Sequence, residues 1–291
     1  MKILITGITG QLGTALTDAL EDDHEIIGLC KDSRCPDHTT IRADLTNWKA
    51  VYDAVTRINP DIVIHAAAQS NVDACQRDPD QAYRVNALGT RNIAAACQRF
   101  DAVMLYVSTD YVFSGTNAPK EGYTEFDAQS PTSVYGQSKW QGEEFVRTLL
   151  NRYFIVRTSW LFGKTRANFV SQIVDAINES KPYTAVDDMF SAPTLVNDLA
   201  GGITKLISTP LYGTYHLTNT GFASRYEIAS FIATQLGLPL TTVKKASLKE
   251  LRLSAPRPAF SALRNYIWEL NGFEPLRSWQ DAVAAFIEGK R

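Results

Sequence analysis

Two side chains that could transfer a proton stand four residues apart in the segment SVYGQSKWQGEE, at positions 133–144. On a helix, residues i and i+4 lie on one face, so Tyr135 and Lys139 can both reach one atom of a bound molecule. A phenol has an unperturbed pKa near ~10, and an ammonium at about 5 Å in a partly dry cleft favours the phenolate by about 3 kcal/mol. We therefore expect Lys139 to lower the pKa of Tyr135 and to make its proton available.

A hydroxyl at the end of an apolar strand gives this pair its context, because a pair of this spacing alone also occurs by chance on exposed helices. The segment LYVSTDYVFSG carries Ser108 and Thr109 upstream of Tyr135. Open α/β sheets bind their ligands at the carboxyl ends of the strands. Thr109 is therefore predicted to donate a hydrogen bond to a carbonyl oxygen that Tyr135 protonates.

A glycine-rich turn near the N-terminus could bind a dinucleotide. The segment KILITGITGQLGTAL places Gly7, Gly10 and Gly13 between a strand and a helix. Glycine permits the tight turn and lets the main chain approach a pyrophosphate, whose charge the helix N-terminus stabilises. The spacing differs from G-x-G-x-x-G, but its place between strand and helix favours a cofactor site over a purely structural turn.

The end of the second strand bears on the choice of cofactor. NAD-specific sites offer a carboxylate to the ribose there, but this segment reads GLCKDSRC. Lys31 or Arg34 would bind a 2′-phosphate, so NADPH is favoured, while Asp32 leaves NADH open. Asp44, followed by Leu45, lies where a carboxylate could contact the adenine. An exposed acid in a loop is an equal alternative for Asp44.

The elements that must position these residues alternate regularly over residues 1–160. Short apolar runs, KILIT, EIIGLC, DIVIHAAA, VMLYVS and YFIVRTS, are separated by amphipathic stretches. This alternation predicts an α/β fold, a Rossmann-type doubly wound parallel sheet. In the helix expected over 47–58, the apolar residues that should pack on the sheet are Trp48, Val51, Tyr52, Val55 and Ile58.

After residue 160 the pattern changes to helices joined by short strands and turns. We interpret residues 161–291 as mainly a smaller, helix-rich substrate-binding lobe and residues 1–160 as the NAD(P)-binding domain. A strand near 213–219, within GTYHLTN, is expected to return to the sheet of the first domain.

Composition narrows the class of partner. The 291 residues are 45% hydrophobic and 21% charged, and the formal net charge is −2 with Lys and Arg scattered along the chain. No basic footprint for nucleic acid or for an anionic membrane results, so a small-molecule partner is expected. The N-terminal MKILITGITG has neither the cleavage site of a signal peptide nor a long apolar span, and we expect a cytoplasmic protein.

The cysteines and histidines do not indicate a metal site. The cysteines, at positions 30, 35, 75 and 97, match no zinc spacing, and we expect reduced structural thiols. His65 and His216 lie in apolar runs, where a hydrogen-bonded structural role is expected. We predict no metal.

The glycine turn, the hydroxyl at the strand end and Y-x-x-x-K, in this order, resemble the short-chain dehydrogenase/reductase superfamily in its extended, sugar-nucleotide branch. Within that branch, STDYVF, VYGQSK, RTSWLFG, SAPT and YHLTN resemble the dTDP-4-dehydrorhamnose reductase family. The resemblance spans essentially the whole chain. It implies an NAD(P)H-dependent reduction of the 4-keto group of dTDP-4-dehydro-6-deoxy-L-mannose to dTDP-L-rhamnose.

The resemblance also implies roles for individual residues. Tyr135 is the proton donor, Lys139 binds the nicotinamide ribose and Thr109 polarises the 4-keto oxygen. Implied cofactor contacts are Gly10, Gln11, Leu12, Ala67, Ala68 and Gln69. Implied sugar-nucleotide contacts are Thr109, Asp110 and Trp160. Arg257 is a further candidate because a guanidinium fork matches phosphate oxygens. Asn86 would support the site, with simple capping equally favoured.

One residue departs from the family. Some members dimerise through magnesium held by glutamates, one of them two residues after the third glycine, where this chain has Ala15. We therefore expect no magnesium-bridged dimer, which leaves a monomer or another kind of homodimer.

Three other functions fit parts of the pattern. A 4,6-dehydratase needs a glutamate after Asp110, and Tyr111 stands there instead. A 4-epimerase or another ketoreductase shares the hydroxyl, the tyrosine and the lysine. A regulatory subunit that binds NADP without catalysis, like that of methionine adenosyltransferase, shares the fold; the intact Thr109, Tyr135 and Lys139 favour an enzyme.

Overall fold

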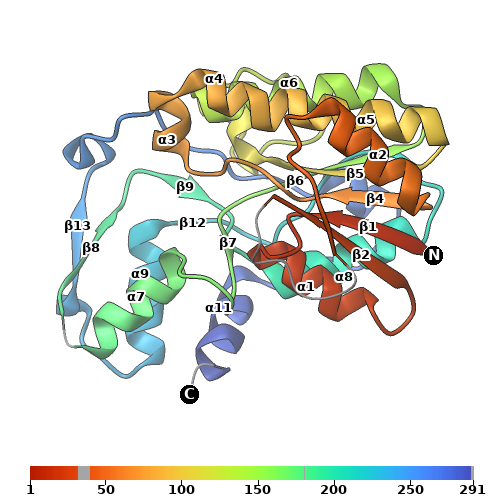
Figure 1. Cartoon of the computed structure of the whole chain (residues 1–291). Coiled ribbons are helices and arrows are strands. Elements are labelled where there is room, and N and C mark those ends of the chain that lie inside the picture. The colour runs from red at the N-terminus through yellow and green to blue at the C-terminus, as the bar shows by residue number, and fades with distance from the viewer. Residues whose placement is uncertain (32–39, 180, 290–291) are drawn as a thin grey trace.

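The computed structural model describes residues 1–31, 40–179 and 181–289. At its centre lies a seven-stranded sheet in the order β11-β6-β5-β4-β1-β2-β3, with all neighbours parallel (Figure 1). The strands are β1 (Lys2–Thr6), β2 (Glu25–Cys30), β3 (Thr40–Arg42), β4 (Ile62–His65), β5 (Val103–Thr109), β6 (Tyr153–Thr158) and β11 (Gly213–His216). The strand order reverses between β1 and β4, which creates the switch point where such sheets bind ligands. The predicted doubly wound α/β fold is confirmed.

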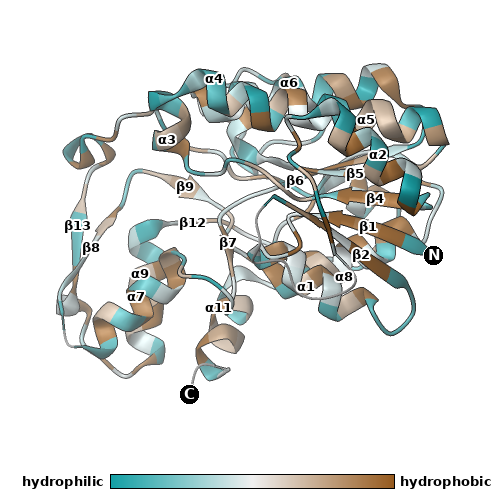
Figure 2. Ribbon diagram, in the orientation of Figure 1, coloured by the Kyte–Doolittle hydropathy of each residue, from teal (hydrophilic) through white to brown (hydrophobic). Residues whose placement is uncertain are grey.

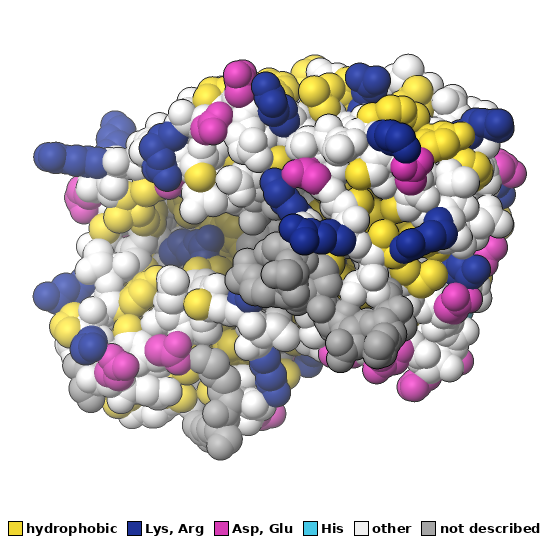
Figure 3. Space-filling view, viewed as in Figure 1, with side chains coloured by type: hydrophobic (Ala, Val, Ile, Leu, Met, Phe, Trp, Pro, Cys, Tyr) yellow, Lys and Arg dark blue, Asp and Glu magenta, His cyan; other side chains and the backbone are white. Residues whose placement is uncertain are grey.

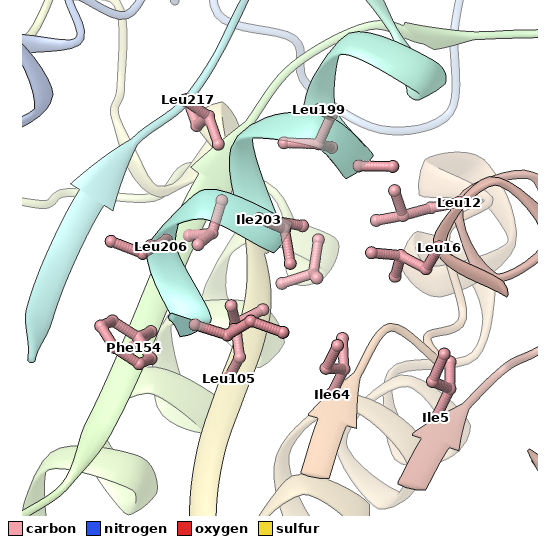
Figure 4. Close-up of a cluster of buried hydrophobic side chains, with 14 of the residues drawn as sticks. Ile5, Leu12, Leu16, Ile64, Leu105, Phe154, Leu199, Ile203, Leu206 and Leu217 are labelled. Atoms are coloured by element: carbon pink, nitrogen blue, oxygen red, sulfur yellow. The ribbon is translucent and has the colours of Figure 1, made fainter. Parts of the chain in front are cut away.

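Helices α1 (Gln11–Leu20), α8 (Val196–Ile207) and α10 (Tyr266–Leu270) belong to the layer on one face of the sheet. Figure 4 shows how this layer is filled: Leu16 of α1 and Ile203 of α8 lie over Ile5 and Ile64, and all four side chains are fully buried. The apolar spacing of α1 is therefore used to hold the start of this helix, with its glycine turn, against the ends of β1 and β4.

The opposite face is covered by α2 (Trp48–Ile58), α5 (Gly89–Phe100) and α6 (Val134–Leu149), seen above the strands in Figure 1. Three short helices precede α5: α3 (Val72–Arg77), α4 (Pro79–Ala82) and the π-helical η1 (Tyr83–Leu88). Figure 2 shows hydrophobic strands between helices whose colouring alternates, as a sheet buried on both faces requires.

The helix predicted over 47–58 is present, but one of its residues is misassigned. Asn47 caps α2 by accepting a hydrogen bond from the Ala50 amide, and Val51 and Val55 are buried as expected. Trp48 is 44% exposed, so the prediction that it packs on the sheet is wrong. The first turn of α2 extends past the core, which leaves Trp48 exposed. The Trp48 ring instead contacts the ring of Tyr52, at 5.3 Å between centroids.

The second lobe is built mainly from later residues around its own apolar core. It contains α7 (Phe169–Asn178), α9 (Arg225–Gln235) and α11 (Trp279–Glu288). Its strands pair as β7 (Leu161–Phe162) with β10 (Thr194–Leu195), β8 (Tyr183–Val186) with β13 (Val243–Ala246), and β9 (Phe190–Ser191) with β12 (Ala223–Ser224). Short 3-10 helices lie at η2 (Asp110–Val112), η3 (Leu240–Thr242) and η4 (Leu248–Leu251).

The chain crosses between the two parts more than once. β11 pairs in parallel with β6, and α8 packs on the sheet together with α1. Our division at residue 160 therefore remains an interpretation, because segments after it complete the first core. Within the described ranges, no helix combines the length and the apolar composition needed to cross a bilayer.

The cysteines divide into two groups. Cys75 and Cys97 are free and buried, and burial raises the pKa of their thiols to about 11 and about 12, so the expectation of structural thiols holds for them. Cys30 is disulfide-bonded, so the same expectation is wrong for that residue. Cys35 lies outside the described residues.

Candidate active site

A cleft of about 670 Å³ opens at the carboxyl ends of the central strands, between the sheet and the second lobe. Figure 3 shows the surface hollowed between the two parts of the molecule. Many residues singled out in the sequence meet in this cleft. Those that line it are Gly7, Gly10, Gln11, Leu12, Gly13, Ala67, Ala68, Thr109, Asp110, Tyr135, Lys139 and Trp160.

The glycine turn forms one wall. Gly7 has a positive φ of 71°, and a Cβ there would lie 2.9 Å from the Cα of Ala67. A Cβ on Gly13 would lie 2.2 Å from the carbonyl oxygen of Gly7, so only glycine lets the helix start so close to the strand. Gly10 is the N-cap of α1, and the first residues of the helix line the cleft. This wall suits a pyrophosphate.

Helix α6 carries the Tyr–Lys pair into the cleft. Ser133 caps the helix by accepting a hydrogen bond from the Gly136 amide, so Tyr135 and Lys139 follow in its first two turns. The Lys139 side chain is buried, and its Nζ donates to the carbonyl oxygen of Val107 at 2.7 Å. The same Nζ lies 4.1 Å from the ring centroid of Tyr106, in a cation–π contact.

The expected lowering of the Tyr135 pKa is not what the structure has. Burial raises the pKa of the Tyr135 phenol well above its usual range, while its hydrogen bond with Thr109 acts in the opposite direction. Burial also lowers the pKa of Lys139 to about 7, against the charge of Glu143. The prediction was wrong because burial penalises the charged phenolate by more than the hydrogen bond with Thr109 favours it. Tyr135 is consequently protonated at neutral pH, as a proton donor must be.

A fully buried ion pair supports the lysine from one helical turn away. Glu143 accepts hydrogen bonds from Arg157 of β6 at 2.9 and 2.7 Å, and its Oε1 also accepts one from Ser108 of β5 at 2.6 Å. Burial alone would raise the pKa of Glu143, but Arg157, aided by Arg147, lowers it to about 2. The carboxylate therefore stays charged beneath Lys139.

Thr109 ends β5 beside a buried acid. Its hydroxyl donates to Asp110 at 3.0 Å and accepts from the Tyr111 amide at 3.2 Å. Burial raises the pKa of Asp110 to about 6, against hydrogen bonds from Ser261 and Ser191. Thr109 thus lies on the same wall as Tyr135 with a hydroxyl whose proton can be turned to a substrate oxygen.

Other predicted residues act behind the lining. Asn86 accepts a hydrogen bond from the Gln69 amide and donates to the Gln69 carbonyl and to Ser138 of α6. It thereby joins the loop after β4 to the helix that carries Tyr135. His65 is buried between Thr6 and Thr90 at 2.6 and 3.0 Å, in the structural role expected.

Some predicted residues are not in the lining. Lys31 forms an ion pair with Asp44 at 3.0 Å, so a 2′-phosphate at Lys31 would compete with that carboxylate. Leu45 is buried and Gln69 is held by Asn86. Arg257 is paired with Asp73 at 2.9 Å. The predicted roles of Arg34 and Asp32 lie outside the described residues.

Sequence reasoning missed several lining residues, among them Arg166, Phe169 and Arg225. Arg225 offered one signal: it is the first residue of a helix, where a positive charge opposes the helix dipole. Phe169 and Arg166 offered none, because an aromatic at a helix start and an arginine in a loop are both ordinary.

Residues 1–291 match the family described as the RmlD substrate binding domain. A spore coat polysaccharide biosynthesis protein, SpsK of Bacillus subtilis, is 34% identical over 288 residues, which span 99% of this chain and 97% of SpsK. The dTDP-4-dehydrorhamnose reductase of Streptomyces griseus is 35% identical, over 96% of this chain and 91% of that protein.

A solved structure agrees. The crystal structure of dTDP-4-dehydrorhamnose reductase from Bacillus anthracis, in complex with NADP, is 39% identical, with a TM-score of 0.90 over 99% of both chains. The family match, the identities and the cleft that holds the Tyr–Lys pair agree with the resemblance inferred from the sequence. The chain belongs to the RmlD substrate-binding-domain family and is a dTDP-4-dehydrorhamnose reductase-like enzyme.

Proposed function

We propose that this protein reduces the 4-keto group of dTDP-4-dehydro-6-deoxy-L-mannose to give dTDP-L-rhamnose, with NADPH or NADH as reductant. The observation that carries the proposal is that Thr109, Tyr135 and Lys139 line the same cleft as the glycine turn. The Bacillus anthracis relative, whose structure holds NADP, supports a nicotinamide cofactor on that turn.

A bound dihydronicotinamide would supply the hydride that reduces C4. Tyr135 then gives its phenolic proton to the alkoxide oxygen that develops at C4, and Thr109 hydrogen-bonds the same oxygen. The charge on Lys139 stabilises the phenolate that Tyr135 becomes, which offsets the cost of ionising a buried phenol. The proton donor, the hydrogen-bond donor and the cation all come from β5 and α6, two elements that pack against each other.

Replacement of the acid tests the mechanism. Tyr135→Phe should lower kcat by at least ~10²-fold, the range for loss of a general acid, with nearly unchanged cofactor affinity. The rate is followed by the absorbance of NADPH in the presence of the 4-keto sugar nucleotide, and the affinity by fluorescence titration with NADPH. Turnover by the variant equal to that of the unaltered protein contradicts the role of Tyr135.

The same assay separates the alternatives. Stoichiometric consumption of NADPH supports a reductase, whereas a cofactor retained through purification and not consumed supports a 4-epimerase. Consumption with other 4-keto sugar nucleotides but not with the dTDP-linked 6-deoxy sugar supports another ketoreductase. NADPH binding without turnover of any of them supports a regulatory subunit.

A further inference from the structure

Arg225 is a cation of the cleft that forms no ion pair among the described residues. Arg225 is the first residue of α9, held by the capping box of Ser224 and Glu227. Its guanidinium carbon lies 3.7 Å from the ring centroid of Trp160 and 3.6 Å from that of Phe169. The Nη1 atom is buried and has no hydrogen-bond partner in the described part of the chain.

The surrounding groups do not neutralise this cation. Among the described ion pairs none involves Arg225, and the buried carboxylate near it, Asp110, already accepts hydrogen bonds from three hydroxyl groups. The neighbouring Arg257 differs, because it is paired with Asp73. Burial lowers the pKa of Arg225 to about 10, which still leaves it charged at neutral pH. A partly buried cation that forms no ion pair with a described residue is costly, so an anion at this position would be bound strongly.

Three locally unfavourable features coincide here. A positive charge in the first turn of α9 opposes the helix dipole. Trp160, which stacks on this charge, has a φ of 41°, a left-handed conformation that costs a non-glycine residue about 1 kcal/mol or more. The Trp160 Nε1 is also buried, and no described residue forms a hydrogen bond with it. Such features persist where ligand binding requires them.

The location indicates which anion. The rings of Trp160 and Phe169 lie close to the guanidinium carbon, and its unused N–H donors can form the fork that matches phosphate oxygens. On the side of the glycine turn the cleft has another arginine, Arg166, which donates to the Thr9 carbonyl. Arg225 instead belongs to α9 of the second lobe, and its electrostatic neighbours include Tyr111 and Asp110, which follow β5.

We propose that Arg225 binds a phosphate oxygen of the substrate's nucleoside diphosphate and so determines the specificity of the cleft for nucleotide-linked sugars. The inference rests on the proposed function in that it assumes a sugar-nucleotide substrate. It adds a residue and a recognition chemistry that the catalytic Tyr–Lys pair does not supply.

The test measures binding rather than turnover. Arg225→Met keeps the length of the side chain and removes the charge, and Arg91→Met, at an exposed position of α5 outside the cleft, is the matched control. Calorimetric titrations use dTDP, UDP, thymidine and NADPH. Loss of one charge-assisted hydrogen bond should raise the Kd of dTDP or UDP by about 10- to 100-fold, with thymidine and NADPH within about twofold.

The binding results distinguish a role of Arg225 in phosphate binding from a purely structural role. Arg225→Lys, which keeps the charge but not the fork, should bind dTDP with intermediate affinity, and it replaces Arg225→Met if the latter does not fold. The inference is overturned if dTDP binds Arg225→Met as it binds Arg91→Met, if only NADPH binding is weakened, or if the unaltered protein binds neither diphosphate. Diphosphate binding that depends on Arg225, in a protein that reduces no 4-keto sugar nucleotide, would retain this inference and remove the proposed reaction.

Discussion

At the scale of single residues, Lys139 decides how much positive charge the site holds. Its Nζ is fixed by the Val107 carbonyl and lies above the Tyr106 ring, so it has little contact with water. Burial lowers its pKa to about 7, although Glu143 opposes the shift. A neutral amine could still donate a hydrogen bond, but it would not stabilise the phenolate of Tyr135.

The pH dependence of the rate follows from this pKa. As the pH rises through about 7, Lys139 loses its proton, and kcat/KM for reduction should fall by about tenfold per pH unit above that value. Lys139→Arg keeps its charge to higher pH and should remove this decline, whereas Lys139→Ala should weaken cofactor binding and rate together. Steady-state rates between pH 5.5 and 9 provide the measurement, and a constant kcat/KM across that range for the unaltered protein would contradict the assignment.

At the scale of elements, α6 places three functional side chains on successive turns. Tyr135 and Lys139 face the cleft, and Glu143, one turn further, pairs with Arg157 of β6 and accepts from Ser108 of β5. The buried pair therefore joins the catalytic helix to two strands. Its directional hydrogen bonds also keep Glu143 charged beneath the lysine.

Removal of one partner of the Glu143–Arg157 pair tests how much this pair stabilises the fold. Glu143→Gln leaves Arg157 buried without its countercharge and should lower the free energy of unfolding by roughly 3 to 5 kcal/mol in urea titrations at pH 7. The double replacement with Arg157→Met should recover much of that loss. If Glu143→Gln and the double variant are equally unstable, altered packing and not the unpaired charge of Arg157 is responsible for the loss of stability.

A fall in pH should weaken the same ion pair between Glu143 and Arg157. The folded pKa of Glu143 is about 2, below its ordinary value of 4.5, so the pair stabilises the fold above pH 4.5 and loses that effect as the pH falls toward 2. Between pH 4.5 and pH 2, the free energy of unfolding of the unaltered protein should therefore fall by roughly 3 kcal/mol more than that of the double variant Glu143→Gln/Arg157→Met.

At the scale of the whole molecule, Asp110 connects the sheet to the second lobe. It follows β5 directly, and its Oδ2 accepts hydrogen bonds from Ser191 at 3.0 Å and Ser261 at 2.5 Å, both buried. The lobes therefore meet at an acid that is one residue from Thr109. A change in this contact should affect both stability and the shape of the cleft.

The two serine hydroxyls favour ionised Asp110, whose pKa is about 6. Ser261→Ala should therefore raise that pKa and destabilise the fold by about 1 to 3 kcal/mol at pH 7.5, and by less at pH 5, where Asp110 is mostly protonated. Ser208→Ala, at an exposed position, is the control and should change stability by under about 0.5 kcal/mol. Urea titrations at the two pH values decide the matter; an effect of Ser261→Ala that is equal at both would contradict a role through Asp110.

Much of the site could be predicted because its chemistry depends on local spacing. Three glycines between strand and helix, a hydroxyl at a strand end, and a Tyr–Lys pair at i and i+4 each have a meaning that the helical and extended periods determine. Those residues line one cleft in the structure. The alternating pattern also predicted the doubly wound sheet, since strands buried on both faces are continuously apolar.

Other features depended on contacts between distant segments. Arg225 of α9 meets Trp160 and Phe169 only in the folded chain, and Lys31 after β2 meets Asp44 after the edge strand β3. The sequence by itself determined which group could donate a proton and which turn could bind a pyrophosphate. Only the tertiary structure decided the direction of the Tyr135 pKa shift and the isolation of the Arg225 charge, because desolvation depends on which segments cover a group and not on its neighbours along the chain.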